Sequence, residues 1–214
     1  LLSLIFNTQP ANAVDVLPQP FFDYLGSKNL ANPGIILLDG SSKEIVYESG
    51  STILRSPASV LKLTSATAVA MTLDSTTVFT TSLYKTEKRG VFVILGENDP
   101  WMTSSAKYRD ANKRAYTPTL IKKAFATDKK LKKITLLYRG VSGTELYKAK
   151  RALGRRASVV YKALDKNIDP KSLITEKVVE IQSPQLLKMI KFALLYSDNL
   201  LSQRLAMLTT TKSG

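Results

Sequence analysis

The stretch Ser56-Pro57-Ala58-Ser59-Val60-Leu61-Lys62 begins an apolar run that continues to Leu73, and it decides how the rest of the chain is interpreted. Serine followed by proline is a common start for an α-helix, because serine caps free N–H groups and proline fits the first helical turn. The run is apolar on nearly every side. The sequence therefore predicts a buried helix from Ala58 to Leu73.

Ser59 and Lys62 stand three residues apart, which places their side chains on one face of that helix. In the first turn, the free N–H groups and the helix dipole favour negative charge on Ser59. Lys62 lies one turn deeper, where loss of water disfavours a charged amine and leaves a base for the serine proton. The alternative is a serine at a helix start and a lysine that extends to the surface.

The composition excludes other mechanisms, because the chain has no histidine and no cysteine. A Ser-His-Asp triad, a cysteine nucleophile, a disulfide framework and a His-based zinc site are all excluded. Ser82/Lys85 and Ser104/Lys107 repeat the Ser-x-x-Lys spacing. The first pair falls in a predicted strand, where such positions point to opposite faces, and the second in a polar stretch. Ser59 is therefore the preferred nucleophile.

A second motif, Ser197-Asp198-Asn199, lies in a polar break between two predicted helices, one after Ser183 and one from near Asn199. Such a break can direct a hydroxyl and an amide into a cleft, or it can simply cap the following helix. The other predicted elements are a helix over 21–30, a hairpin of strands 35–39 and 44–48, strands over 79–86, 91–95 and 133–138, and helices over 118–127 and 143–153.

Positive charge is concentrated in one segment. The chain carries a net charge of +14, and residues 101–180 contain 20 lysines and arginines against 7 aspartates and glutamates. We interpret 101–177 as a basic inserted segment. It lies between 14–100 and 178–214, which we interpret as the two parts of one core. A basic surface of this kind suits anionic wall polymers or an anionic membrane surface, or it is simply solvated. The apparent signal peptide at the N-terminus argues against nucleic acid as the partner.

The N-terminus reads as the end of a secretory signal peptide. An apolar run from Leu1 to Phe6 is followed by Ala11-Asn12-Ala13, a small-x-small cleavage pattern. We therefore expect residues 1–13 to be a signal-peptide remnant and the mature protein to begin at Val14. The alternative is a short buried strand or helix start. The prediction places the protein in the periplasm or at the extracellular cell-wall face of a bacterium.

The order Ser-x-x-Lys then Ser-Asp-Asn is that of the penicillin-recognising serine enzymes. The sequence around it resembles the D-alanyl-D-alanine carboxypeptidase/endopeptidase group, the type-4 penicillin-binding proteins. The resemblance covers residues 30–100 and 175–208 and is poor over 103–174. It rests on the hairpin with Leu38-Asp39-Gly40 and Val46-Tyr47, the stretch 55–66, the strand 79–83, the turn Leu95-Gly96-Glu97-Asn98-Asp99-Pro100, Ser183-Pro184 and the run 196–205.

The resemblance implies an α+β, α/β-sandwich transpeptidase core of the penicillin-binding-protein/β-lactamase kind. It implies a serine-type D-Ala-D-Ala carboxypeptidase acting on peptidoglycan stem peptides through an acyl-enzyme on Ser59, which β-lactams would also acylate. Lys62 would be the base, Ser197 would pass the proton to the leaving amine, and Asn199 would hold Lys62 and the substrate amide. No metal or organic cofactor is implied.

One departure from the family concerns its third motif, Lys-Thr-Gly on a core strand. Lys212-Ser213-Gly214 follows Asn199 by only 13 residues, too few for that strand. We therefore expect the chain to be a fragment without its C-terminal strands, and inactive as given. The alternative function is a non-catalytic relative that binds cell wall.

Overall fold

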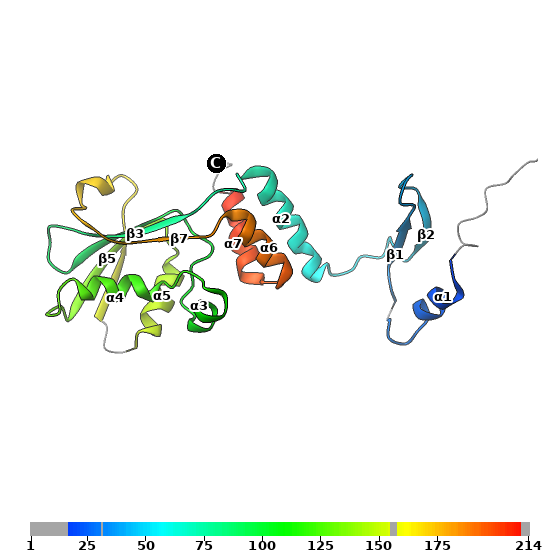
Figure 1. Ribbon diagram of the computed structural model, residues 1–214, viewed down its shortest axis with the longest axis horizontal. Coiled ribbons are helices and arrows are strands. Elements are labelled where there is room, and N and C mark those ends of the chain that lie inside the picture. Colours follow the sequence, from blue (N-terminus) through cyan, green and yellow to red (C-terminus); the bar gives the residue numbers. More distant parts are fainter. Residues whose placement is uncertain (1–16, 31, 155–157, 211–214) are drawn as a thin grey trace, which may run out of the picture. The chain divides into compact units, whose positions relative to one another are not determined.

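The computed structural model describes residues 17–30, 32–154 and 158–210. The predicted signal remnant, residues 1–13, and Lys212-Ser213-Gly214 lie outside this range. The chain divides into two compact units, residues 1–57 and residues 58–214 (Figure 1). In the described residues it contains seven α-helices and a five-stranded mixed sheet. The α+β class is therefore confirmed.

The first unit contains helix α1 (Gln19–Leu25) and a hairpin of strands β1 (Ile35–Leu38) and β2 (Ile45–Ser49). The strands are antiparallel, as predicted. The helix starts two residues earlier than predicted and ends at Leu25, five residues before the predicted end, with Gly26 as its C-cap. Phe21 and Phe22 of the helix pack edge-on against Tyr47 of β2, with ring centroids 5.6 and 5.7 Å away.

The second unit is built on a sheet with the strand order β6-β5-β4-β3-β7. Its strands are β3 (Thr80–Lys85), β4 (Val91–Gly96), β5 (Lys133–Arg139), β6 (Ser158–Ala163) and β7 (Lys177–Gln182). Strand β3 is antiparallel to both neighbours, whereas β4, β5 and β6 are parallel. Parallel neighbours require crossover connections, which α4 (Pro118–Ala126) and α5 (Gly143–Ala152) provide.

Helices α4 and α5 cover one face of the sheet and close a first hydrophobic core (Figure 1). Its fully buried members include Leu83 and Ile94 from the antiparallel strands, Leu136 from β5, and Leu120 and Leu146 from the two helices. The basic stretch 101–177 thus contributes β5, β6, α4 and α5 to the same sheet and core as β3 and β4.

A layer of three helices forms the second core. Helix α2 (Leu61–Thr72) packs against α6 (Leu186–Leu195) and α7 (Asn199–Thr210). The core between them contains Val69, Met189, Leu201 and Leu205, with Phe79 and Trp101 from the sheet side of the unit. Two short elements, α3 (Ala106–Asn112) and the 3₁₀ turn η3 (Pro170–Ser172), complete the unit.

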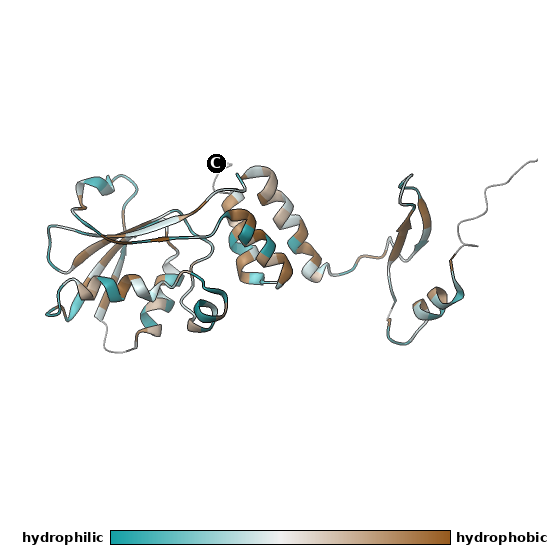
Figure 2. Ribbon diagram, in the orientation of Figure 1, coloured by the Kyte–Doolittle hydropathy of each residue, from teal (hydrophilic) through white to brown (hydrophobic). Residues whose placement is uncertain are grey.

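Helix α2 differs from its prediction in two ways. It follows a 3₁₀ turn, η2 (Ala58–Val60), and no side chain caps it, so the predicted Ser56-Pro57 cap is wrong and the α-helix starts at Leu61 rather than Ala58. It is also not buried all round: Val69 is buried, whereas Leu63 is 55% and Met71 81% exposed. The reason is that α6 and α7 cover one side of the helix, and its apolar residues continue around the other side (Figure 2). Within the described parts of the chain, no helix is long and apolar enough to cross a membrane.

Candidate active site

The candidate site begins at the junction of η2 and α2. Ser59 lies in the 3₁₀ turn and Lys62 in the first turn of the helix. Because they are three residues apart, their side chains lie on the same face of this helical segment. Lys62 Nζ donates a hydrogen bond to Ser59 Oγ over 3.1 Å. Lys62 is half-buried, and the serine is exposed. The structure therefore brings together the first two residues that the sequence selected.

Ser197 completes a cluster of three polar groups. Its Oγ lies 2.9 Å from Ser59 Oγ, a hydrogen bond between residues 138 positions apart in the sequence. Ser197 has a φ of 51°, in the left-handed region that non-glycine residues rarely adopt. Ala58, directly before Ser59, has a φ of 43°. Both hydroxyls are thus placed by unusual backbone, which is common at functional sites.

Asp198 fixes the break that carries Ser197. Its Oδ1 accepts a hydrogen bond from the backbone N–H of Leu201 over 2.9 Å, so it caps α7. Its Oδ2 accepts one from Arg114 Nη1 over 3.0 Å. The two interpretations of Ser197-Asp198-Asn199 therefore both apply: Asp198 caps a helix, and Ser197 directs its hydroxyl towards Ser59.

Arg114 is the residue that sequence reasoning missed. Its side chain is 1% exposed, it donates hydrogen bonds to the backbone oxygens of Pro100 and Trp101, and its guanidinium lies 4.8 Å from the Trp101 ring centroid. Burial lowers the pKa of Arg114, while the Asp198 carboxylate acts in the opposite direction. The residue ties the turn after β4 to the break before α7. Nothing in the sequence distinguishes it from its many basic neighbours.

Asn199 is the first residue of α7 and is exposed. Among the described residues, no hydrogen bond joins its side chain to Lys62. It lines a cavity of about 430 Å³ beside Ser197, together with the side chains of Tyr108, Phe192 and Tyr196. Ser59 and Lys62 are not part of that lining. The cavity can accept a partly apolar group beside Ser197.

The other two Ser-x-x-Lys matches have different surroundings. Ser82 is buried in β3 and donates to Glu180, while Lys85 pairs with Glu176 at 2.7 Å. Ser104 donates to Glu145, across a separate cavity. In the described structure no hydrogen bond joins either serine to its lysine. Of the three matches, the pair at 59 and 62 alone has that contact within the residues described.

Asp99, in the turn after β4, is a buried carboxyl next to this site. Its Oδ1 accepts from the backbone N–H of Trp101 over 2.8 Å, and its buried Oδ2 has no hydrogen-bond partner among the described residues. Burial raises the pKa of Asp99 to about 6, against the opposing effects of that hydrogen bond and of Arg114 and Arg204. The described residues contain no cluster of three or more carboxylates that could hold a metal ion.

Comparison with protein-family models and with curated proteins found no match to this chain. The chemistry of the site therefore has to be argued from its geometry. A hydroxyl that contacts both an amine and a second hydroxyl is an arrangement that can transfer a proton from the first oxygen to a leaving group.

Proposed function

We propose that this chain carries the acylation site of a serine-type D-Ala-D-Ala carboxypeptidase/endopeptidase of the penicillin-binding-protein kind. One observation carries the proposal: Ser59 Oγ lies within hydrogen-bonding distance of both Lys62 Nζ and Ser197 Oγ. The two contacts unite, in space, motifs that the sequence analysis found in the order typical of these enzymes.

The three groups have separate roles in the proposed reaction. Lys62 takes the proton of the Ser59 hydroxyl while Ser59 Oγ attacks the carbonyl between two D-alanines. The C–N bond breaks as the acyl-enzyme forms, and the departing amine receives its proton through Ser197. Water then releases the acyl group from Ser59. No step requires a metal or cofactor.

The substrate side of the proposal rests on the cavity next to Ser197. Its aromatic lining and its exposed Asn199 suit a peptide with apolar methyl groups and amides that need hydrogen bonds. Asn199 would bind a substrate amide, and the Ser59 N–H would serve the oxyanion. The proposed substrate is a peptidoglycan stem peptide, which requires an exported protein. β-Lactams would acylate the same serine.

Covalent labelling with a fluorescent penicillin tests the proposal, using the protein expressed from its complete reading frame. We expect one label per molecule, with mass spectrometry of the digested protein locating it on Ser59. Ser59→Ala should abolish labelling, whereas Ser82→Ala and Ser104→Ala, the two matched serines, should retain it. Labelling that persists without Ser59 would refute the assignment. A folded protein that takes no label but binds peptidoglycan would favour the non-catalytic wall-binding alternative.

A further inference from the structure

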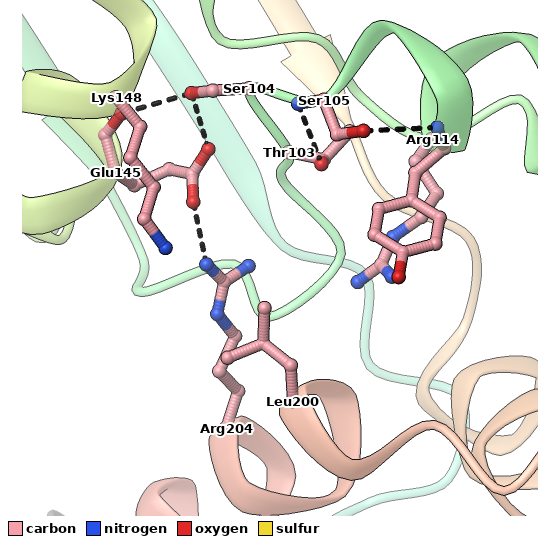
Figure 3. Close-up of a pocket in the computed structure, with 9 residues that line it drawn as sticks. Thr103, Ser104, Ser105, Arg114, Glu145, Lys148, Leu200 and Arg204 are labelled. Atoms are coloured by element: carbon pink, nitrogen blue, oxygen red, sulfur yellow. Dashed lines mark hydrogen bonds and ion pairs between the residues drawn. The ribbon is translucent and has the colours of Figure 1, made fainter.

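A second cavity lies between α5, the start of α3 and α7, and its lining contains three cationic side chains and one carboxylate (Figure 3). It has a volume of about 250 Å³. Three positive side chains reach it from three different segments: Arg114, Lys148 and Arg204. Among the described residues, Glu145 is the single carboxylate in the lining. We infer that this cavity is a binding site for a small oxyanion, a carboxylate or phosphate group.

The Glu145 carboxylate offsets the charge of Arg204 and leaves the other positive side chains of the lining unaffected. Its Oε1 accepts a hydrogen bond from Ser104 over 2.5 Å, and its Oε2 accepts one from Arg204 over 2.6 Å. Both oxygens are thus engaged with fixed neighbours, as Figure 3 shows. Arg114 is held in the same way by Asp198, which is not part of the lining of this cavity. Each arginine therefore has one carboxylate partner.

Lys148 differs from the two arginines in its surroundings. In the part of the chain that the structure describes, its ammonium makes no hydrogen bond and no ion pair, although it lies on the same face of α5 as Glu145. An anion in the cavity would supply the missing partner. Lys148 is exposed, and because each arginine is already paired with a carboxylate, it carries the positive charge of this group that has no carboxylate partner among the described residues. That remaining charge makes the local potential favourable for an anion.

The remaining polar groups of the lining can donate hydrogen bonds. Thr103 Oγ1 accepts from the backbone N–H of Ser105 over 3.1 Å, and Ser105 Oγ accepts from the backbone N–H of Tyr108 over 3.4 Å. Each hydroxyl thus uses its oxygen as an acceptor and keeps its own proton to donate. A ligand that only accepts hydrogen bonds and carries negative charge matches this set of donors, whereas a metal ion does not.

This site is separate from the proposed acylation site, because neither Ser59 nor Lys62 lines it. Arg204 and Glu145 join α7 to α5 across the cavity. An oxyanion bound to Lys148 and Arg204 would bridge the same two helices. Oxyanion binding in this cavity does not therefore depend on any reaction at Ser59.

Isothermal titration calorimetry with inorganic phosphate tests the inference, with potassium chloride keeping the ionic strength constant. A second titration series with acetate shows whether the site prefers a phosphate or a carboxylate group. We expect saturable binding of one ion per chain with a Kd on the order of 1 mM. Lys148→Gln should weaken it roughly tenfold, whereas Lys122→Gln, which removes an exposed lysine on α4, should change it less than about twofold.

A variant that should strengthen phosphate binding completes the test. Glu145→Gln keeps the shape and the acceptor for Ser104 but removes the negative charge of that side chain, so it should tighten phosphate binding several-fold. Absence of saturable binding in the unaltered chain would overturn the inference. Equal weakening by Lys148→Gln and Lys122→Gln would also overturn it, because it would show that phosphate responds only to the net charge of the protein.

Discussion

The buried ion pair between Arg114 and Asp198 joins the turn after β4 to the break that carries Ser197. The guanidinium Nη1 lies 3.0 Å from the carboxylate, and the two side chains are 1% and 14% exposed. Both members have further partners, since Arg114 also donates to two backbone oxygens and Asp198 also caps α7. The pair is therefore part of a network, and removal of one member leaves the other charge buried.

Arg114→Met should lower the free energy of unfolding by about 3–5 kcal/mol, because it leaves the Asp198 carboxylate without its cation. Asp198→Asn should cost less, since asparagine still caps the N–H of Leu201. Urea denaturation measures both. Arg109→Met is the matched control: Arg109 pairs with Asp110 on the surface, and such pairs contribute less than about 1 kcal/mol. Similar losses for the two arginines would contradict the role given to Arg114.

Asp99 predicts a dependence of stability on pH. Its pKa is about 6 in the folded protein, under the influence of burial, Arg114, Arg204 and Glu97, and about 3.9 in an unfolded chain. The folded state therefore binds more protons between these values, so stability falls as pH rises from about 4 to about 6 and then stays lower. The difference amounts to about 3 kcal/mol.

Asp99→Asn should remove that contribution and make the protein more stable at pH 7, while its side-chain oxygen still accepts from Trp101. Urea denaturation at a series of pH values is the measurement. Asp165→Asn, on an exposed turn, is the control for loss of a surface carboxylate. If Asp99→Asn is destabilising at pH 7, the Asp99 carboxylate contributes favourably and the argument from burial is wrong.

The left-handed backbone at Ala58 predicts an unusual response to glycine. Ala58→Gly relieves the steric cost of a positive φ, which offsets the extra freedom of glycine in the unfolded chain. Stability should be unchanged or rise by up to about 1 kcal/mol. Ala68→Gly, at an exposed position within α2, should instead cost about 1 kcal/mol. Thermal denaturation compares the two, and equal losses would show that position 58 has no strain to relieve.

Lys62 and Ser197 should both control the rate of acylation. In the protein from its complete reading frame, Lys62→Ala should slow labelling by fluorescent penicillin by about 10²–10⁴, because the base is removed. Ser197→Ala should slow it as well. Lys188→Ala, on α6, and Ser65→Ala, one turn further along α2, are the matched controls and should label at the normal rate. Normal labelling of Lys62→Ala would exclude it as the base.

Much of the fold was predictable because apolar runs are separated by glycine, proline and polar residues. The hairpin β1–β2, strands β3, β4 and β5, and helices α4 to α7 all appear where the sequence predicted them. Strands β6 and β7 were missed. They form the two edges of the sheet, and charged residues interrupt their apolar residues, Lys162 in β6 and Lys177 and Glu180 in β7. The burial of α2 was overestimated because an apolar composition does not say which faces find a partner.

The candidate site shows the same limit. The three-residue spacing places Ser59, in the 3₁₀ turn, beside Lys62, at the start of α2, and the order of motifs pointed to Ser197. The role of Arg114 could not be predicted, because its partner Asp198 lies 84 positions away and only the packed turn after β4 brings them together. Local pattern thus identifies the three groups of the candidate site, whereas the groups that hold them in place depend on tertiary packing.

From the 138 positions between Ser59 and Ser197 we expect an order of folding. The parallel unit β4–α4–β5–α5–β6 is continuous in sequence and can form from neighbouring segments, whereas α2 precedes the sheet and α7 follows it. Contacts between such distant segments form late, because the intervening chain must first be closed. A nascent chain therefore displays Ser59 and Lys62 long before Ser197 arrives, and the three-group cluster stays latent until the sheet between them is complete.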